Sequence, residues 1–366
     1  MDKYVLFYPH VPEAAKDAAR KVLDTRFIGQ GPLVDAFEEV WEKKISNPHK
    51  AVAVGSGTDA LHLAYILADV GLGDEVIAPV FTCTATNIPI LYQRGTIKFA
   101  DVNRYNLNIN VESVKRLITE RTKAIVCVDY GGLPCELNEL QALADKYGIP
   151  LIEDAAQAHG AIYHGKKVGS IADFTTFSFQ AIKIITTCDG GMLTIKNPKW
   201  VEKAKVIRWF GIDRAAKLAD RWANDITELG YKYQMTDVAA AMGIAAMYEL
   251  NVTLRHHRAL FEVYRKRLKD IPGITFIGDD TRIRSSCWLA TAFVEKRNEF
   301  RKKLKERGIE TNQVHYRNDM YTIFGGRVQN CPNMDYLEDK YIVLPMHYFL
   351  TEEDINFICD VIQEGW

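Results

Sequence analysis

The chain is predicted to fold as a three-layer α/β domain followed by a smaller α+β domain. Between residue 51 and about residue 195, short apolar runs alternate with segments of helix length. The runs are apolar throughout, which is typical of parallel strands covered on both faces of a sheet. The chain has 366 residues, 48% of them apolar, which suffices for about two domains.

Each predicted strand of the first domain is followed by a predicted helix. The runs AVAV, EVIAPV, IKFADV, AIVCVDY and PLIEDA have strand length, and the segments after the first four repeat apolar residues at helical spacing. The predicted strands are 51–54, 75–80, 97–102, 124–130 and 150–155, and the helices are 59–70, 84–94, 111–121 and 137–148. Two further strands are predicted at 172–179 and 190–196, and a helix at 201–210.

The second domain is predicted to begin near residue 250, so that the domains cover residues 1–250 and 251–366. The alanine-rich stretch 236–250 precedes a long amphipathic helix at 255–271, which would lead out of the first domain. Strand-like and helical segments then follow in the order expected of a smaller α+β domain. These segments are 274–278, 287–294, 302–312 and 354–363.

Charge and composition exclude several classes of partner. The 46 basic residues nearly balance the 47 acidic ones, so no strong field attracts nucleic acid or an anionic membrane. No apolar run approaches the length of a membrane span, and the N-terminus lacks the long apolar core of a signal peptide, which predicts a cytoplasmic protein. The seven cysteines are scattered and odd in number, as expected of free thiols.

The stretch AVAVGSGTDALHLA predicts a strand, a glycine turn and a helix. Gly55, Gly57 and Ala60 fit the pattern G-x-G-x-x-G/A, which suits a phosphate at the start of a helix. A dinucleotide site would need an acidic residue at the end of the next strand, but EVIAPV ends in proline and valine. GSGTDA also lacks the G-K-[ST] ending of a nucleotide-triphosphate loop. A tight turn without a ligand remains the plain alternative.

Two downstream residues indicate which phosphate compound would bind. Asp154 ends an apolar strand, where it could bind a ligand or cap the next helix. Lys183 stands in an almost uncharged stretch, although most lysines are solvated surface groups. A phosphate site, a strand-end carboxylate and a secluded lysine together match the needs of pyridoxal phosphate. An apolar setting would lower the pKa of the lysine, and the carboxylate would keep the pyridine nitrogen protonated.

At these residues the sequence resembles the sugar aminotransferases of the DegT/DnrJ/EryC1/StrS group, within the fold-type I pyridoxal-phosphate enzymes. The resemblance covers nearly the whole chain, through GQGP, GSGTDAL, GDEVIAP, EDAAQAHGA, SFQAIK, TTCDGGM, GYKYQMTD and LPMH. It implies that Gly57, Thr58 and Ser178 bind the cofactor phosphate, and it implies a homodimer. Asp154 would pair with the pyridine nitrogen, and Lys183 would carry the cofactor as a Schiff base.

The resemblance further implies that Gln157 contacts the ring oxygen of the cofactor. The alternatives are that Gln157 only caps a helix and that Ser178 only bonds backbone groups. Related sugar dehydratases carry histidine where Lys183 stands, so the lysine favours transamination. The context AIKIITTCDGG is similar to members of the perosamine and viosamine synthase type. It therefore implies amination at C4 of a nucleotide-linked 4-keto-6-deoxy sugar, with glutamate as the donor, rather than amination at C3.

Two positions depart from the family pattern. Lys232 in GYKYQM replaces an asparagine that reaches the phosphate in the partner subunit, and it could supply a charge there or turn to solvent. Cys83 stands where many relatives place an aromatic ring on the pyridine, so either Phe81 or another group would substitute, or the ring would pack against smaller side chains. Phe81 is also a candidate substrate contact. His315 and Tyr316 match a region that lines the active site in relatives.

Arg208 and Asp213 also match an active-site loop of relatives, and for all four of these residues exposure or domain packing is the alternative. The histidines of RHHR, at 255–258, are spaced wrongly for a metal pair on a helix, and no metal is predicted. A cofactor-binding regulator without catalytic activity, marked by Lys232 and Cys83, is a second hypothesis. A nicotinamide dehydrogenase is a distant third.

Overall fold

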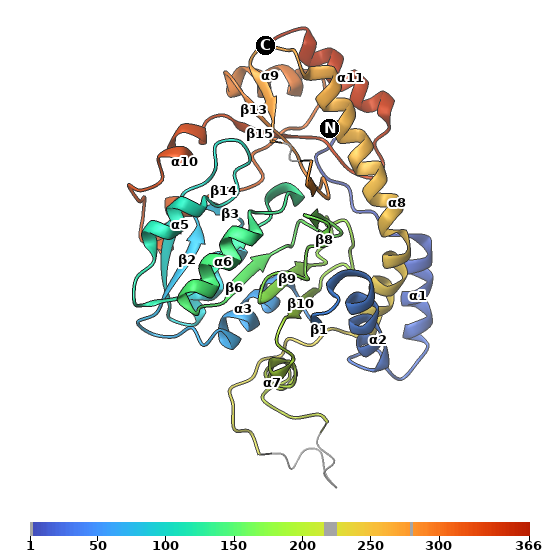
Figure 1. The fold of residues 1–366 in the computed structure, drawn as a ribbon. Helices are drawn as coiled ribbons and strands as arrows, with labels where there is room; N and C mark the ends of the chain where they lie inside the picture. Colours follow the sequence, from blue (N-terminus) through green and yellow to red (C-terminus); the bar gives the residue numbers. More distant parts are fainter. Residues whose placement is uncertain (1–2, 216–224, 279–280) are drawn as a thin grey trace.

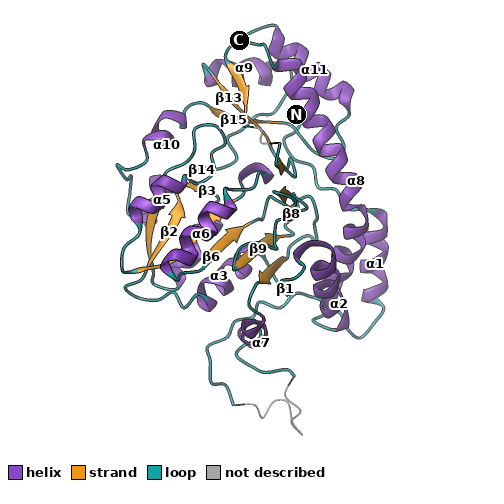
Figure 2. Cartoon of the chain, in the orientation of Figure 1, coloured by secondary structure: helices purple, strands orange, loops and turns teal. Residues whose placement is uncertain are grey.

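The computed structural model describes residues 3–215, 225–278 and 281–366. Its centre is a sheet of seven strands (Figure 1), and helices cover both faces of this sheet (Figure 2). In spatial order the strands are β1 (Lys50–Val54), β10 (Gly191–Ile195), β9 (Phe174–Ser178), β6 (Leu151–Asp154), β5 (Thr122–Val128), β2 (Glu75–Pro79) and β4 (Thr96–Ala100).

The sheet is parallel except for β10. This strand runs antiparallel to both of its neighbours, β1 and β9. The segment 179–190 that joins β9 to β10 contains no helix that could carry the chain back for a parallel pairing, so the chain reverses directly. The strand predicted at 190–196 is confirmed. Its antiparallel direction could not be predicted from the apolar pattern.

Side chains on both faces of the sheet are buried, which explains the continuous apolar runs. Val76 and Ile77 follow each other in β2, point to opposite faces and are both fully buried. Val76 packs in a core with helix α3 (Gly57–Leu67), while Ile77 packs in a second core with helices α5 (Val111–Leu117) and α6 (Leu137–Tyr147). The three-layer α/β architecture is therefore confirmed. The remaining helices of this region are α4 (Thr84–Tyr92) and α7 (Val201–Ile207).

A second sheet of three antiparallel strands lies near the C-terminal end of the chain (Figure 1). It is formed by β11 (Ile274–Phe276), β13 (Ala290–Val294) and β15 (Tyr341–Leu344), and it packs with α9 (Arg297–Glu306) and α11 (Glu352–Gln363). Helix α9 begins before the predicted segment 302–312 and ends before Gly308, which has a positive φ of 71°.

One long helix, α8 (Asp237–Leu268), joins the two regions (Figure 1). The stretches predicted as 236–250 and 255–271 are parts of this single helix, and the predicted domain boundary at residue 250 lies inside it. Its first half packs against α1 (Glu13–Leu23) and α2 (Pro32–Trp41), and its second half packs against α11. Met247 belongs to the core of the large sheet, whereas Leu260 belongs to the core of the small sheet.

Shorter elements complete the chain. Two-residue strands β3 (Phe81–Thr82) and β14 (Tyr316–Arg317) pair with each other, and β12 (Ile283–Arg284), β7 (Ile162–Tyr163) and β8 (Lys166–Lys167) form a small sheet. Helix α10 covers Pro332–Leu337, a π-helical turn covers Glu42–Ser46, and 3₁₀ turns cover Tyr130–Gly132, Pro198–Trp200, Asn318–Met320 and Thr322–Phe324. Among the described residues, no helix combines the length and apolarity needed to cross a membrane.

Candidate active site

Four of the predicted site residues lie at the carboxyl edge of the large sheet. Asp154 ends β6, Ser178 ends the neighbouring parallel strand β9, and Gly57 begins α3 directly after the turn that follows β1. Lys183 lies in the segment between β9 and β10, which leaves from the same edge. Ligands of open α/β sheets bind at this edge. The sheet therefore brings together residues that are more than 100 positions apart in the sequence.

The start of α3 makes a close approach to Ser178. A side-chain Cβ placed on Gly57 would lie 2.7 Å from the Cβ of Ser178 and 3.1 Å from its hydroxyl oxygen. The hydroxyl of Ser56 accepts a hydrogen bond from the Asp59 N–H at 3.1 Å, which caps the helix. The first N–H groups of a helix, here those of Gly57 and Thr58, have no partner within the helix. Together with the Ser178 hydroxyl they could bind an anion, and we call this arrangement the anion cradle.

One carboxyl group lies in the first turn of α3, close to this cradle. Burial raises the pKa of Asp59 to about 6, and the charge of Asp189 acts in the same direction. The carboxyl of Asp59 therefore becomes protonated as the pH falls below about 6 and is mostly ionised at pH 7.

Asp154 is buried and firmly held. Its carboxylate accepts hydrogen bonds from the Thr86 hydroxyl at 2.7 Å and from the Ala156 N–H at 3.1 Å. Burial raises the pKa of Asp154, while these two hydrogen bonds and the charge of Lys183 lower it. A buried carboxylate is stabilised by a cationic N–H partner, because such a partner offsets the free-energy cost of burying the charge.

Lys183 has the properties expected of a reactive amine. Burial lowers its pKa to about 8, although the charges of Cys83 and Asp154 act in the opposite direction. Its amino nitrogen lies 3.8 Å from the centre of the Trp288 ring. A lysine with a pKa near 8 has a substantial neutral fraction at physiological pH, and the neutral form is the nucleophile and the base.

Gln157 and His315 lie against each other beside this group. The side-chain oxygen of Gln157 accepts a hydrogen bond from the Gly131 N–H at 2.8 Å, and its side-chain nitrogen lies 3.2 Å from Nε2 of His315. Burial lowers the pKa of His315 to about 3, so the ring is neutral. Because the amide nitrogen of Gln157 can only donate, Nε2 accepts and the proton of the ring is assigned to Nδ1. Tyr316 is 38% exposed next to His315.

Two predicted residues lie outside this group. Phe81 is 1% exposed and makes edge contacts with the rings of Tyr130 and Tyr341, which leaves no free ring face. Lys232 is exposed and places its amino nitrogen 5.1 Å from the centre of the Trp209 ring. Cys83, by contrast, is exposed and close enough for its charge to affect Lys183.

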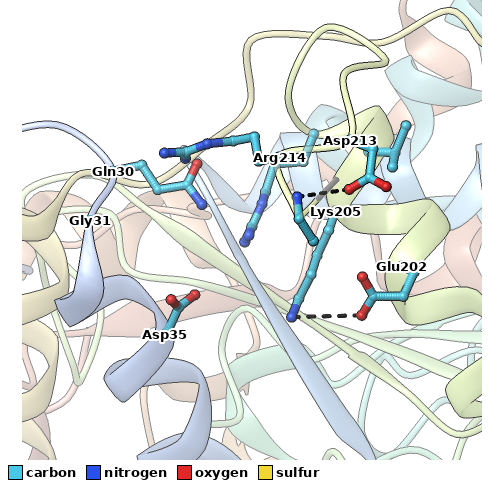
Figure 3. A pocket seen from close by; sticks show the side chains of 10 residues that line it. Gln30, Gly31, Asp35, Glu202, Lys205, Asp213 and Arg214 are labelled. Carbon is cyan, nitrogen blue, oxygen red and sulfur yellow. Dashed lines mark hydrogen bonds and ion pairs between the residues drawn. The ribbon is translucent and has the colours of Figure 1, made fainter. Parts of the chain in front are cut away.

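Arg208 and Asp213 also lie apart from Lys183. Arg208 is buried; it forms an ion pair with Glu38 of α2 at 2.6 Å and donates a hydrogen bond to the carbonyl of Ala53 in β1 at 2.8 Å. It therefore joins the end of α7 to α2 and to the sheet. Asp213 lines a pocket of about 350 Å³ between the start of α2 and the chain after α7 (Figure 3). In this pocket Lys205 points toward Glu202, at 4.0 Å.

Two contacts of the site were not predicted from the sequence. Thr86 orients Asp154, and Trp288 lies beneath Lys183. Thr86 belongs to the quoted stretch FTCTAT and Trp288 to the predicted strand CWLATAFV. Neither a threonine in a helix nor a tryptophan near a buried strand carries a local signal of its role.

Comparison with known proteins identifies the family. The model of the DegT/DnrJ/EryC1/StrS aminotransferase family matches residues 9–363. The chain belongs to this family. It is 30% identical to the GDP-perosamine synthase of Escherichia coli O157:H7 over 367 residues, covering 99% of this chain and 98% of that protein.

Solved structures of sugar aminotransferases have the same fold. That of CalS13 from Micromonospora echinospora is 30% identical, with a TM-score of 0.94 over 99% of this chain and 100% of that chain. The PLP-form structure of Spr1654 from Streptococcus pneumoniae is 27% identical, with a TM-score of 0.92 over 99% of this chain and 98% of that chain. The predicted fold class and the resemblance to this aminotransferase family are confirmed.

The residues at the sheet edge fit pyridoxal phosphate. The cradle at Gly57 and Ser178 suits the phosphate, and the raised pKa of the buried Asp154 suits a protonated ring nitrogen. The lowered pKa of Lys183 suits attachment to an aldehyde.

Proposed function

We propose that this pyridoxal-phosphate aminotransferase moves the amino group of glutamate to C4 of a nucleotide-linked 4-keto-6-deoxy sugar. The observation that carries the proposal is the position of Lys183, with a pKa lowered to about 8, at the sheet edge that also holds Asp154 and Ser178. The match to a GDP-perosamine synthase over 99% of this chain supports an amino-sugar product.

Each side chain has a distinct task in this proposal. The N–H groups of Gly57 and Thr58 and the hydroxyl of Ser178 would bind the phosphate, and Asp154 would bind the ring nitrogen. Gln157 would contact the ring oxygen through its amide nitrogen, since its oxygen is already used by the Gly131 N–H. When bound, the cofactor would supply a ring that stabilises negative charge on the carbon from which a proton is removed.

Lys183 would also act as the proton carrier. Its neutral amine would take a proton from the substrate carbon and so become an ammonium group. It would then give that proton to C4′ of the cofactor in the same half of the reaction. Its pKa of about 8 serves both steps, because the amine accepts and the ammonium donates near neutral pH. His315 and the exposed Tyr316 would face the sugar, while the buried Phe81 would support the site by packing.

The proposed assembly is a homodimer with a site near the subunit interface. The chain after α7 extends away from the body of the molecule (Figure 1), and its described part carries exposed apolar side chains. Ile226 is 55% exposed and Leu229 is 77% exposed, as expected of a surface that a second subunit covers. Lys232, on the returning part of this extension, would reach the phosphate in the partner subunit.

The first experiment is an absorbance spectrum of the protein with added pyridoxal phosphate, before and after glutamate. Wild type is expected to show the band of the lysine-bound cofactor, and glutamate is expected to convert it to the band of the amine form. Lys183→Ala should lose both effects. Lys199→Ala is the matched control, because Lys199 also lies over a tryptophan ring, 4.7 Å from the centre of Trp200, but is exposed. Absence of the band in wild type would overturn the proposal.

The amine form of the protein then allows the substrate to be determined. It would be mixed with 4-keto-6-deoxy and 3-keto sugars linked to GDP, UDP or dTDP, and the products would be identified by mass spectrometry and NMR. Recovery of the lysine-bound band with a 4-keto sugar alone supports amination at C4. Recovery with a 3-keto sugar alone would replace that part of the proposal with amination at C3. Conversion by glutamate without recovery by any keto sugar would contradict a sugar substrate.

A further inference from the structure

Trp288 lies directly against the amino group of Lys183. The lysine nitrogen is 3.8 Å from the centre of the indole ring, and Trp288 is only 3% exposed. The indole N–H donates a hydrogen bond of 2.9 Å to the carbonyl of Ile182, the residue before the lysine. The ring is therefore bonded to the same short segment whose side chain it contacts.

Other segments fix the ring from behind. The ring of Phe7 stacks on Trp288 with centres 5.5 Å apart and planes inclined by 22°. The backbone N–H of Trp288 donates to the carbonyl of Gly131 at 3.0 Å, and the N–H of Gly131 donates to Gln157. Trp288 is consequently held by the N-terminal segment, by the turn after β5 and by the loop of Lys183. It connects that loop to Gln157.

The ring face favours the charged form of the lysine. An ammonium group within about 6 Å of a tryptophan ring centre is attracted by the negative face of the ring, and more strongly so when water is excluded. The other titratable groups around Lys183 are Cys83 at the start of α4, Asp154 at the end of β6, and the neutral rings of His159 and His315. Cys83 and Asp154 favour the ammonium, and burial opposes it.

We propose that Trp288 is a positioning residue that holds the amino group of Lys183 whenever this lysine is not bonded to the cofactor. This inference rests on the proposed function. In each half of the reaction the released amine takes a proton and later returns it. Between the two steps it is an ammonium group, and the ring face keeps it next to the site instead of letting it turn toward solvent. In each half of the reaction Lys183 therefore takes up one proton and releases one proton.

The first test uses protein without cofactor and therefore needs no activity. The pH dependence of Lys183 acetylation by acetic anhydride, followed by mass spectrometry, gives the pKa of this lysine. Trp288→Leu is expected to lower that pKa by about one unit, because it removes the ring face while the site stays apolar. Trp288→Phe keeps a ring face and should keep most of the effect. Trp200→Leu, at a tryptophan beside surface lysines, should leave the pKa of Lys183 unchanged.

Equal pKa values of Lys183 in wild type, Trp288→Leu and Trp288→Phe would overturn the inference. Should the leucine variant fail to fold, wild type itself supplies the measurement. The fluorescence of Trp288 is expected to titrate with a midpoint of about 8 in wild type, and this titration should be absent in Lys183→Met. Identical titrations in the two proteins would also contradict the contact.

A second measurement separates this inference from the proposed function. Trp288→Leu loaded with cofactor is expected to bind glutamate as wild type does but to convert it at least about tenfold more slowly, because the proton carrier is less well placed. A cofactor band in wild type with equal conversion rates in the variant would refute the role of Trp288 alone. A wild type without any band would refute the proposed function, while the acetylation result would still report on the contact.

Discussion

Gly57 lies so close to Ser178 that a single methyl group would disturb the anion cradle. Its Cβ would lie 2.7 Å from the Cβ of Ser178, so the start of α3 or the end of β9 must move. We expect Gly57→Ala to weaken binding of pyridoxal phosphate by roughly 10- to 100-fold, since hydrogen bonds to a charged group are each worth about 1.5–3 kcal/mol. Titration of the cofactor into the protein, followed by absorbance or calorimetry, measures this change.

The matched control for this change is Gly71→Ala. A Cβ on Gly71 would meet its nearest neighbour, a side-chain oxygen of Asp74, at 3.8 Å, an ordinary contact distance. This variant should bind the cofactor as wild type does. If Gly57→Ala also bound with unchanged affinity, the phosphate would lie elsewhere and the cradle at Ser178 would lose its assignment.

Sequence patterns predict the position of a candidate site residue well where that residue stands at the end of a strand. Asp154 and Ser178 end strands and Lys183 follows one, and the sheet brings them to one edge. The contact between Trp288 and Lys183 was not predicted, because it depends on how two distant segments pack. For Phe81 the aromatic residue type suggested contact with the ring or the substrate, but the pleat of β3 turns the side chain into the core.

Helix α2 depends on a side chain from another part of the chain. Asp237, at the start of α8, is 1% exposed and accepts hydrogen bonds from the N–H groups of Gly31 at 2.8 Å, Leu33 at 3.1 Å and Val34 at 3.1 Å. We expect Asp237→Ala to lower the free energy of unfolding by about 3–5 kcal/mol, because it leaves buried donors without an acceptor. Urea unfolding followed by circular dichroism measures the loss.

Asp35→Ala is the companion variant at the same helix end. Asp35 lies in the first turn of α2 but is exposed, so it contributes only through the helix dipole, by at most about 1 kcal/mol. A loss in Asp237→Ala no greater than that in Asp35→Ala would show that water replaces the buried acceptor. The cap would then not hold the loop GQGP against α8.

At the scale of elements, the apolar runs predicted the strands of the large sheet, because both faces of that sheet are buried. Burial on both faces gives no information on strand direction, because a run such as GGMLTIK in β10 is equally apolar in a parallel and in an antiparallel strand. The four-residue strand β15 was not predicted. Its pairing with β13 is set by tertiary contacts, and so short a run has no distinctive period.

At the scale of the whole molecule, the sequence predicted two regions but not how they are joined. Helix α8 packs in both cores, and Tyr4 from the N-terminal end packs in the core of the small sheet. The N–H of Tyr4 bonds the carbonyl of Gly308, and the N–H of Glu310 bonds the carbonyl of Tyr4. Local periodicity does not predict a pairing of segments some 300 residues apart, so this pairing is seen only in the structure.

Acid should destabilise the whole molecule through its buried histidines. Burial lowers the pKa of five buried histidines to about 3 or 4. They are His49, His62, His159, His257 and His347. Their pKa in the unfolded chain is about 6.5, so below that pH the unfolded chain binds more protons than the native protein. The stability that they contribute is therefore fully present above about pH 6.5 and is lost as the pH falls toward 4.

Each such histidine lowers the free energy of unfolding by up to about 1.4 kcal/mol per pH unit in this window. Buried carboxyls with a raised pKa, such as Asp59 and Glu153, act in the opposite direction over the same window. The histidine contribution is therefore measured as the difference between the urea midpoints of wild type and His159→Phe at about pH 7.5, 6 and 5. His159 lies among the rings of Trp41, Phe177 and Phe179, so His159→Phe should fit and make the fall less steep. His164→Phe, at an exposed position, should leave the slope as in wild type. Equal pH dependence of the midpoint in wild type and His159→Phe would mean that the His159 ring is solvated enough to titrate in the native protein.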